Sequence, residues 1–563
     1  MKFLNKNTTI IIGSIIVLVV LSGLFHFRID LTSDKRHSIS RQTKELMKSI
    51  DEPIDAVIYL TGDLNSGFLR LKNSATEMLT ELNAFSKSNI NIRFHNPSEA
   101  ESAKLREQKY LELEKRGIIG TTVYDKDKEG KAIQKIVFPW VELSQSGKTI
   151  AVNLLKNDPA LSGEENLNIS IENLEFELTD AVRRLVKKDV EKIAFLEGHG
   201  ELGELETYEI SKSLSHYFQI DRGVIGTDAS VLDEYKAVII AKPTEQFSEK
   251  DKFVLDQYVM NGGSLLWLID GVRISEENLA QSGVSAVMPL DLNLGDLLFR
   301  YGIRINPVLV EDVQSTLMPV NIAPKGEKPQ FHPVPWVFAP ILLTSREHNA
   351  TKNTPPVKAR FASMVEPVGT DKSIEKTVIL ATSSNTHITP TPASISLAFM
   401  PDLKDKNYFN LAHVPVGAVL EGSFPSAFAN RMVPPEIQPA PQIIKSSKKT
   451  RQIVFADGDI IRNEVVQHTD SLQTLPLGFD RYTNRQFGNN ELITNAILYI
   501  TDKDGWMKLR SRTIPLRLLN KSKATEQRIK WQIINVLLPL ILLSILGVVY
   551  QFHRKRKYTS GKL

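Results

Sequence analysis

The sequence predicts an α/β protein in which a large folded region lies between two membrane helices. Segments with the pattern of strands alternate with segments with the pattern of helices through most of the chain, and this alternation is typical of a sheet covered by helices. Two long apolar segments lie near the ends, at residues 8–25 and 531–552. The chain of 563 residues is also too long for one hydrophobic core, so we expect more than one domain between those segments.

Each apolar segment is long enough to cross a bilayer as a helix, which takes about 20 residues, and neither contains a charged side chain. Lys2 and Lys6 precede the first segment, and a basic run at 554–557 follows the second. Because short basic flanks stay in the cytoplasm, we expect both termini to be cytoplasmic. A cleaved signal peptide is the alternative for the first segment, but no small-residue cleavage site follows it.

The predicted topology places the chain in the inner membrane, with residues from about 28 to 530 in the periplasm. An N-terminal anchor covers 1–27, a basic juxtamembrane segment covers 506–530, the second membrane helix covers 531–552, and a basic cytoplasmic tail covers 553–563.

Composition excludes several kinds of chemistry. The chain has no cysteine, which excludes disulfides, thiolate metal sites and cysteine nucleophiles. A net charge of +4, with no long basic block in the interior, argues against nucleic acid as a partner. The tripeptide at 147–149 resembles the end of a P-loop, but Glu142 stands where that motif needs glycine. We therefore expect no ATP hydrolysis by this chain.

The first folded region, 28–164, has the element order β-α-β-α-β-β. Strands are expected at "IDAVIYL" and "INIRFHNP", helices at 73–87 and 99–116, and a hairpin of "KIVFPWVELS" with "KTIAVNLL". This order predicts a thioredoxin-like domain without the Cys-x-x-Cys of the redox-active proteins. A helix at 165–188 is predicted to link it to a second domain.

The second folded region, 189–505, is predicted to be a parallel, doubly wound sheet. Strands are expected at "KIAFLEG", "AVIIAKP" and "GGSLLWLID", with a helix from about 204 to 218 and another that is capped by Ser248. Proline-rich stretches at 314–360 and 422–444 are interpreted as loops or linkers. Near the end, "RQIVFADGDIIRN" is a strand and turn, and "NNELITNAILYIT" is a helix that packs on the sheet.

The loop of Gly198, His199, Gly200 and Glu201 is the first candidate site. It lies between a predicted strand and helix, where backbone N–H groups can hold a phosphate. Four glutamates crowd the same helix start and would repel a phosphate: Glu197, Glu201, Glu204 and Glu206. We favour glycines for a tight turn and a histidine held by a carboxylate, with a structural or partner-contact role ahead of catalysis.

Asp457 and Asp459, on either side of Gly458 at a strand end, form the second candidate site. Two carboxylates can bind a divalent cation, but a turn or cap role is more common and is favoured. We expect no metal and no cofactor. An alternative is an enzyme pocket that combines His199 with Asp457 or Asp459, and it requires both loops to lie at the carboxyl ends of adjacent strands.

Five segments carry a resemblance to a known family: "IDLTSDKRHSIS", "VFPWVELSQSGKTIAVNLL", "IAFLEGHGE", "NLGDLLFRYGIRINPVLVED" and "GNNELITNAILYI". In this order they resemble GldG, the gliding-motility-associated component of an ABC transporter in Bacteroidetes. The resemblance implies an ABC-transporter auxiliary domain whose fold is similar to a class I glutamine amidotransferase without its catalytic residues. It also implies an ATPase and a permease as partners and makes the Gly198–Glu201 loop a landmark of the fold.

We therefore expect a non-catalytic, membrane-anchored ABC transporter subunit whose periplasmic domain binds substrate or couples the ATPase cycle to the envelope. The expected partners are permease and ATPase subunits, inner-membrane lipid and envelope proteins, and the link to gliding motility rests on the resemblance alone. Two alternatives are the enzyme described above and a pure scaffold whose proline-rich loops contact other envelope proteins.

Overall fold

The computed structural model describes most of the chain, namely residues 39–100, 102–126, 132–158, 161–187, 189–321, 323, 327–328, 330–468, 471–511 and 525–559. The apolar segment at 8–25 lies outside the described residues, as does most of the predicted juxtamembrane segment. The chain divides into two units, Met1–Thr513 and Ile514–Leu563.

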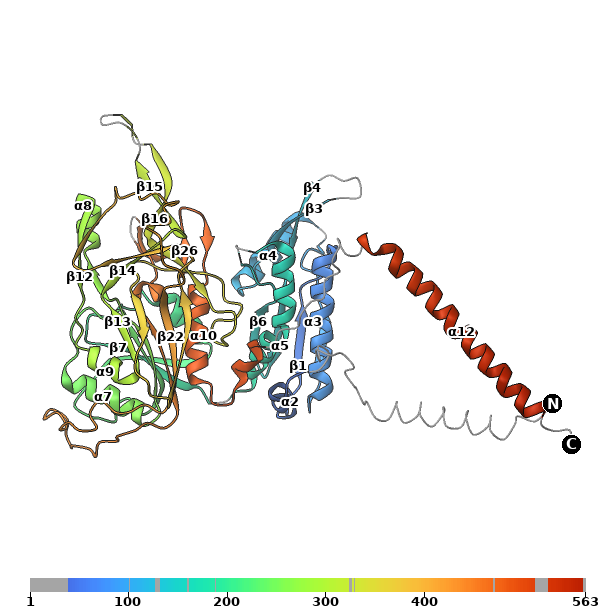
Figure 1. Ribbon diagram of the computed structural model, residues 1–563, viewed down its shortest axis with the longest axis horizontal. Coiled ribbons are helices and arrows are strands. Elements are labelled where there is room, and N and C mark those ends of the chain that lie inside the picture. Colours follow the sequence, from blue (N-terminus) through green and yellow to red (C-terminus); the bar gives the residue numbers. More distant parts are fainter. Residues whose placement is uncertain are drawn as a thin grey trace. The chain divides into compact units, whose positions relative to one another are not determined.

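The first domain is built on a four-stranded sheet in the order β2-β1-β5-β6 (Figure 1). β1 and β2 are parallel, β5 runs antiparallel to β1, and β6 runs antiparallel to β5. The main sheet thus contains the four strands of the predicted β-α-β-α-β-β order, and the β3–β4 pair is inserted between α4 and β5. The elements are α2 (Arg41–Lys48), β1 (Ile54–Ile58), α3 (Ser66–Phe85), β2 (Ile90–Phe94), α4 (Ala103–Lys115), β5 (Trp140–Gln145) and β6 (Lys148–Asn153).

One predicted strand of this domain is two strands. The segment before Pro139 is β4 (Ala132–Val137), which pairs with β3 (Thr121–Lys126) in a separate hairpin. The segment after Pro139 is β5, which joins the main sheet. Proline has no N–H to donate to a strand ladder, so it stands at the change from one sheet to the other.

α5 (Gly163–Val186) starts at a capping box formed by Ser162 and Glu165. The sequence predicts this helix as a linker. In the structure it also belongs to the first core, because its apolar side chains recur at helical spacing and are buried with β1 and α3: Leu174, Leu178, Ala181, Val182 and Leu185.

The second domain contains a ten-stranded sheet in which five neighbouring strands are parallel, in the order β8-β7-β9-β10-β23. The prediction of a parallel sheet is correct for this half. The other half is antiparallel, and its pairing was not predicted, although the pattern of "EKTVILATS" predicts the strand β19 within it. The parallel strands are β7 (Glu191–Glu197), β8 (Phe218–Val224), β9 (Tyr235–Ala241), β10 (Ser264–Leu268) and β23 (Thr450–Phe455), and the others are β15 (Ser315–Asn321), β16 (Phe331–Thr344), β17 (Val357–Lys358), β19 (Ile374–Ala381) and β22 (Pro415–Gly422).

Helices cover both faces of the parallel strands, as the doubly wound prediction requires. α6 (Tyr208–Leu214) and α10 (Asn489–Thr501) pack on one face, where Phe195 and Ile239 are buried. α7 (Glu249–Met260) and α9 (Gly295–Tyr301) pack on the other, where Trp267 is buried. Alternate residues of each strand point to opposite faces, so one sheet carries two cores.

Two predictions in this domain are wrong in extent. The helix predicted for 204–218 is only α6, because Phe218 already begins the edge strand β8. The proline-rich stretch at 314–360 is not a loop, since "HPVPWVFAP" lies inside β16. Proline is tolerated there because this part of β16 pairs only with the outer strand β15 and meets β19 only at its last residues. Figure 1 shows the β15–β16 hairpin extending from the second domain.

The stretch at 422–444 has no helix or strand after the end of β22 apart from an isolated bridge at Pro425, as predicted. The remaining short elements of this domain are β11 (Val272–Ile274), α8 (Glu276–Ser282), β12 (Val284–Pro289), β13 (Ile303–Asn306), β14 (Val308–Asp312), β18 (Met364–Pro367), β20 (Thr386–Pro390), β21 (Ala393–Ser396), η1 (Gly458–Ile461), β24 (Val465–His468), β25 (Ser471–Thr474), β26 (Phe479–Asp480), β27 (Arg485–Gln486) and η2 (Trp506–Ser511).

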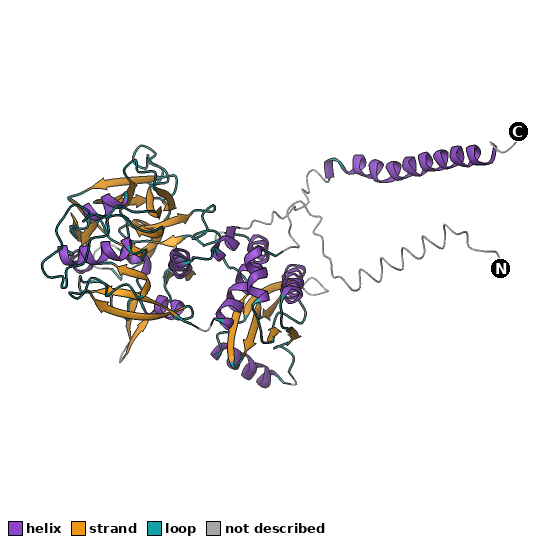
Figure 2. Cartoon of the chain, turned by 90° about the horizontal axis from the view of Figure 1, so that it is seen from below, coloured by secondary structure: helices purple, strands orange, loops and turns teal. Residues whose placement is uncertain are grey.

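The second unit contains α12 (Arg528–Thr559), which Figure 2 shows as one continuous helix. Its stretch Arg528–Arg556 is, among the described residues, the one helix long and apolar enough to cross a membrane, and its most apolar 18 residues have a mean hydropathy of 2.5. Pro539 lies inside it without ending it. The predicted second membrane segment is therefore helical over its whole length.

Candidate functional site at the carboxyl edge of the parallel strands

The carboxyl ends of the parallel strands bring the predicted site residues to one edge of the second domain. His199 follows β7, Lys242 follows β9, Asp270 follows β10, and Asp457 and Asp459 follow β23. The chain connections run in opposite directions on the two sides of the β7–β9 pair. Ligands of open α/β sheets bind at such a switch point, so the His199 loop holds the expected position.

The His199 ring fills that position itself. Its Nδ1 lies 3.0 Å from Glu201 Oε1 and its Nε2 lies 3.2 Å from Asp251 Oδ2. The ring stacks on Phe247 with centroids 3.7 Å apart, and the residue is 5% exposed. The predicted carboxylate partner is thus present, together with a second one from the first turn of α7 that the sequence did not indicate.

The loop backbone also ties β7 to β9. The carbonyl oxygen of His199 accepts hydrogen bonds from the N–H groups of Thr244 and Glu245, at 2.8 and 2.9 Å. Gly200 has φ +71°, and a Cβ there would lie 2.1 Å from the Thr244 hydroxyl. The glycine is therefore required by both conformation and space.

The two carboxylates decide the charge of the ring. Burial opposes the protonated form, but hydrogen bonds to Asp251 and Glu201 outweigh it and raise the pKa of His199 to about 9. Burial likewise opposes the ionised form of Asp251, while its hydrogen bonds to His199 and Ser248 lower the pKa of Asp251 to about 2. Near neutral pH the loop holds an imidazolium between two carboxylates, with neither ring nitrogen left to act as a base.

The combined pocket of His199 with Asp457 or Asp459 is not formed. The strand order places β9 and β10 between β7 and β23, which at the usual strand spacing is about 14 Å. His199 and the Asp457 loop thus do not follow adjacent strands, and the alternative of a shared enzyme pocket lacks the adjacency that it requires.

Asp457 and Asp459 belong instead to a buried charge cluster. Lys242 Nζ lies 2.6 Å from Asp459 Oδ2 and 3.3 Å from Asp270 Oδ2. Asp457 caps η1 by accepting from Asp459 N at 2.7 Å, and it also accepts from Arg360 N at 2.7 Å. The favoured cap role of Asp457 is confirmed, and the lysine occupies the place between carboxylates that a cation would take.

Charge is distributed unequally among these carboxylates. Burial and the neighbouring Asp459 raise the pKa of Asp457 well above its usual range. For Asp459 burial acts in the same direction, but the adjacent Lys242 ammonium prevails and lowers its pKa. Burial also raises the pKa of Asp270. The cluster therefore pairs one lysine with one firmly ionised carboxylate beside two that protonate more readily.

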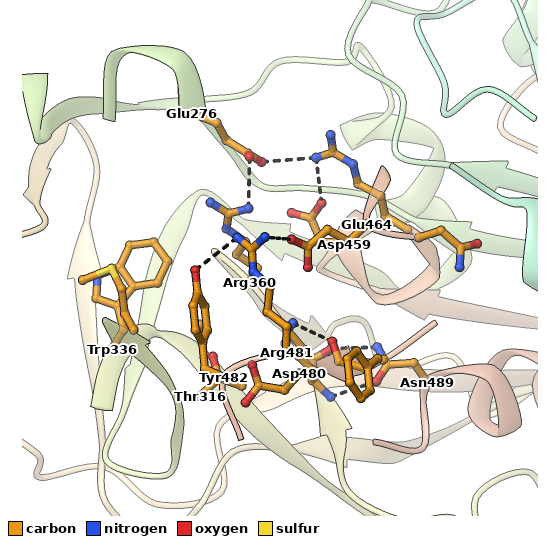
Figure 3. A pocket seen from close by; sticks show the side chains of 18 of the residues that line it. Glu276, Thr316, Trp336, Arg360, Asp459, Glu464, Asp480, Arg481, Tyr482 and Asn489 are labelled. Atoms are coloured by element: carbon orange, nitrogen blue, oxygen red, sulfur yellow. Dashed lines mark hydrogen bonds and ion pairs between the residues drawn. The ribbon is translucent and has the colours of Figure 1, made fainter. Parts of the chain in front are cut away.

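A cavity of about 550 Å³ opens beside Asp459. Figure 3 shows its charged rim, in which Glu276 of α8 bonds both Arg360 and Arg462, at 3.0 and 3.2 Å. Arg462 also reaches Asp459 at 3.4 Å, and Arg481 pairs with Glu464 at 3.2 Å. Each of these guanidinium groups is thus held in place by a carboxylate.

The opposite wall of the cavity is aromatic and comes from the antiparallel half of the sheet. Trp336 of β16 is 8% exposed and lies under the Arg360 guanidinium, 5.8 Å from the ring centroid. Its indole Nε1 and the Nε of Arg360 are buried without a hydrogen-bond partner among the described residues. A buried donor without an acceptor is costly, so both groups favour a ligand that brings acceptor atoms.

The described residues contain no group of three or more His, Asp or Glu side chains arranged to hold a metal ion. The cavity lining contains no serine and no histidine. What the arrangement offers chemically is a pre-formed cavity with fixed donors, acceptors and an aromatic wall, the usual composition of a small-molecule site.

Sequence reasoning missed most of this cavity. Lys242 lies near the end of the predicted strand "AVIIAKP", where a charged side chain is a usable signal, and Arg462 lies in the same motif as Asp457 and Asp459. Trp336 and Arg360 lie in the stretch 314–360, whose prolines predict a loop. Their position depends on the pairing of β15, β16 and β17, which is not local in the sequence.

One of the comparisons with known proteins identifies a family. The family model described as ABC-type uncharacterized transport system matches residues 191–496, and a domain of unknown function (DUF7088) matches residues 33–144. An uncharacterized protein of Borreliella burgdorferi strain B31 is 22% identical over 98% of both chains.

Likenesses to solved structures are weak. The mmIFT52 N-terminal domain is 16% identical with a TM-score of 0.32 and covers 56% of this chain and 99% of its own. The exo-β-1,4-mannosidase Op5Man5 of an Opitutaceae bacterium is 10% identical with a TM-score of 0.19 and covers 69% of this chain and 45% of its own. Neither carries an argument about this chain. The family model, in contrast, covers more than half of the residues, and the chain belongs to the ABC-type uncharacterized transport system family.

Proposed function

We propose that this chain is a non-catalytic, membrane-anchored accessory subunit of an ABC transporter whose second domain binds a small ligand in the cavity beside Asp459. Family membership supports the association with a transporter. The observation that carries the binding role is the 550 Å³ cavity at the carboxyl edge, with its paired guanidinium groups and unpartnered Trp336 indole.

A binding role fits this cavity better than a catalytic one. Nucleophilic catalysis requires a nucleophile within hydrogen-bond reach of a base. The cavity lining offers no serine and no histidine, and its lysine, Lys358, donates to the carbonyl oxygen of Phe479 at 3.1 Å. Both ring nitrogens of His199 are occupied by the carboxylates of Glu201 and Asp251. The loop of Gly198, His199, Gly200 and Glu201 is then a structural or partner-contact element.

The finer parts of the proposal concern topology and context. α12, followed by the basic residues 554–557, supports a membrane anchor with a cytoplasmic tail. Residues 28–530 would then be periplasmic, with permease and ATPase subunits as partners in the inner membrane. The proposal also includes a thioredoxin-like first domain, which rests on the order of its elements. A glutamine-amidotransferase-like second domain and a role in gliding motility rest on the resemblance to GldG.

The ligand role is tested by filling the cavity. Ala280 lines it from the exposed side of α8, and the next residue, Gln281, is exposed but does not line it. The full-length chain, Ala280→Trp and Gln281→Trp are purified from the native host, denatured, and compared by mass spectrometry of the released small molecules. A molecule that is released by the parent and Gln281→Trp but not by Ala280→Trp supports the proposal. A parent chain that releases nothing, or an Ala280→Trp variant that releases the same molecule, contradicts it.

A scaffold role is the second candidate, favoured by the β15–β16 hairpin. The hairpin extends from the second domain (Figure 1), and Phe331 near its tip is 64% exposed. Exposed aromatic side chains often anchor protein contacts. The test is co-purification of envelope proteins with the tagged full-length chain and with its Phe331→Ser variant. If the variant loses these proteins but still releases the same small molecule, the hairpin is a docking element.

A further inference from the structure

A second cavity, of about 360 Å³, lies where the two folded domains meet. Its walls come from α5 and β6 of the first domain, from β8 and α10 of the second, and from η2. η2 is the last described element before α12 in the sequence. A ligand in this cavity would therefore touch both domains and the start of the segment that leads to the membrane helix.

The charges around this cavity are unbalanced. Four cationic side chains line it, Lys148, Arg183, Arg184 and Lys187, against two carboxylates, Asp180 and Glu191. The carboxylates already have cationic partners, because Arg184 pairs with Asp180 at 3.0 Å and Lys187 with Glu191 at 3.0 Å.

Two of the cations remain without a carboxylate. Among the described residues no ion pair is formed by Arg183 or Lys148; Lys148 donates only to the carbonyl oxygen of Lys187, at 3.4 Å. The Arg183 guanidinium lies 4.5 Å from the centroid of the Trp506 ring, which in turn stacks on Phe176 at 5.1 Å with an interplanar angle of 3°. This contact with the ring uses no N–H hydrogen bond to a carboxylate, so the donors of the Arg183 guanidinium can bind an oxyanion.

Positive charge predominates around the cavity. His216 lines it, and burial together with the neighbouring Arg184 and Lys212 charges lowers the pKa of this histidine. Phe218 and Leu498 make up part of the remaining wall. The site therefore combines apolar surface with two cationic side chains, Arg183 and Lys148, that form no ion pair among the described residues.

We propose that this cavity binds a phosphate group carried on a partly apolar ligand, with Arg183 and Lys148 as its main contacts. Arginine is suited to phosphate because its planar fork of donors matches the phosphate oxygens. A phospholipid headgroup and a free phosphorylated compound share this chemistry. Binding of either would stabilise the junction of α5, α10 and η2 by mass action. This inference does not depend on the cavity beside Asp459.

The test uses the full-length chain in dodecyl maltoside micelles, which contain no phosphate, with the thermal unfolding midpoint and tryptophan fluorescence as readouts. Inorganic phosphate is titrated into one sample, and phosphatidylglycerol is added to the micelles of another. We expect one of these probes to raise the midpoint and to change the fluorescence, because Trp506 lines the site. A response to phosphate identifies a soluble ligand class, and a response to phosphatidylglycerol alone identifies a lipid headgroup.

Charge-matched variants make the test specific. Arg183→Gln and Lys148→Gln should each weaken the response at least tenfold, whereas Lys212→Gln, which removes a nearby charge that does not line the cavity, should leave it unchanged. Lys148 is exposed, so its variant keeps the test valid if Arg183→Gln does not fold. The proposal is overturned if neither probe gives a response, or if Lys212→Gln weakens it as much as the other two variants do.

Discussion

At the scale of single residues, His199 is a buried charge held by geometry. Both ring nitrogens face carboxylates, and Phe247 closes one face of the ring. Such an arrangement resembles a catalytic motif in the sequence because the same residue types serve both purposes. Here the two carboxylates bind both ring nitrogens of the histidine, so neither nitrogen is left to contact a substrate.

The raised pKa of His199 predicts a pH dependence of stability. Its folded-state pKa of about 9 exceeds the ordinary value of 6.5, so its contribution is complete below about pH 6.5 and is lost as the pH rises through about 9. We expect the free energy of unfolding to fall over this range by on the order of 1–3 kcal/mol more in the parent than in His199→Gln. Denaturant unfolding of both chains at pH 6 and pH 9 measures the difference. An equal change in the free energy of unfolding between the two pH values in both chains would show that the ring is not charged.

Lys242 is predicted to be essential to the cluster at the carboxyl edge. Lys242→Met leaves Asp459 and Asp270 buried without their cation and should cost about 3–5 kcal/mol. Lys242→Met combined with Asp459→Asn should recover part of this loss, because the ionised carboxylate is then gone. Thermal unfolding of the single and double variants checks the coupling, and strictly additive losses would argue against the pair.

At the scale of elements, the loop after β7 depends on glycine. Gly200→Ala meets both a left-handed φ and the Thr244 hydroxyl, whereas Gly203→Ala in the same loop meets nothing within 4 Å. We expect Gly200→Ala to lower stability by about 1–3 kcal/mol and Gly203→Ala to change it by less than about 0.5 kcal/mol. Parallel thermal unfolding of the two variants is the measurement, and equal effects would contradict the geometry of the loop.

α5 is the element that joins the parts of the first unit. Glu175 accepts hydrogen bonds from Ser40 and Thr43 of the α2 start, Phe176 stacks on Trp506 of η2, and Lys156 joins Glu177 to Glu491 of α10. A single helix thus contacts the segment after the first apolar stretch, the segment before α12, and the second domain.

The stacked pair Phe176–Trp506 predicts an energetic coupling between α5 and η2. Each alanine substitution should cost about 3 kcal/mol, and the double variant should cost about 1 kcal/mol less than the sum. A double-mutant cycle from denaturant unfolding measures this coupling. Phe331→Ala, at an exposed position, serves as the control with no expected loss, and additive behaviour of Phe176→Ala and Trp506→Ala would remove the link.

Elements with a local signal were predictable and elements that depend on distant pairing were not. β7, β9 and β10 are continuous apolar runs, and Ser248 caps α7 as its position suggested. β16 was missed because its prolines suggest a loop, and only its place beside the outer strand permits them. The same reason explains the site: His199 and Asp457 were found from local motifs, whereas Trp336 and Arg360 reach the cavity through pairing far along the chain.

At the scale of the whole molecule, the described parts have separate tasks. The second domain carries the cavity beside Asp459, α5 and η2 join the two folded domains, and α12 has the length and apolar character of a membrane helix. In the proposed function, a ligand bound in the second domain would be reported through these features to partners in the membrane.

The most direct measurement of the central claim is native mass spectrometry of the tagged full-length chain after gentle detergent extraction from its own host. We predict a complex in which this chain is present in fixed ratio with a multi-span permease and a P-loop ATPase. A tagged, unrelated single-span protein extracted in parallel controls for chance recovery. A chain that emerges alone, under conditions in which other ABC complexes of the same membrane stay intact, would contradict its role as a transporter subunit.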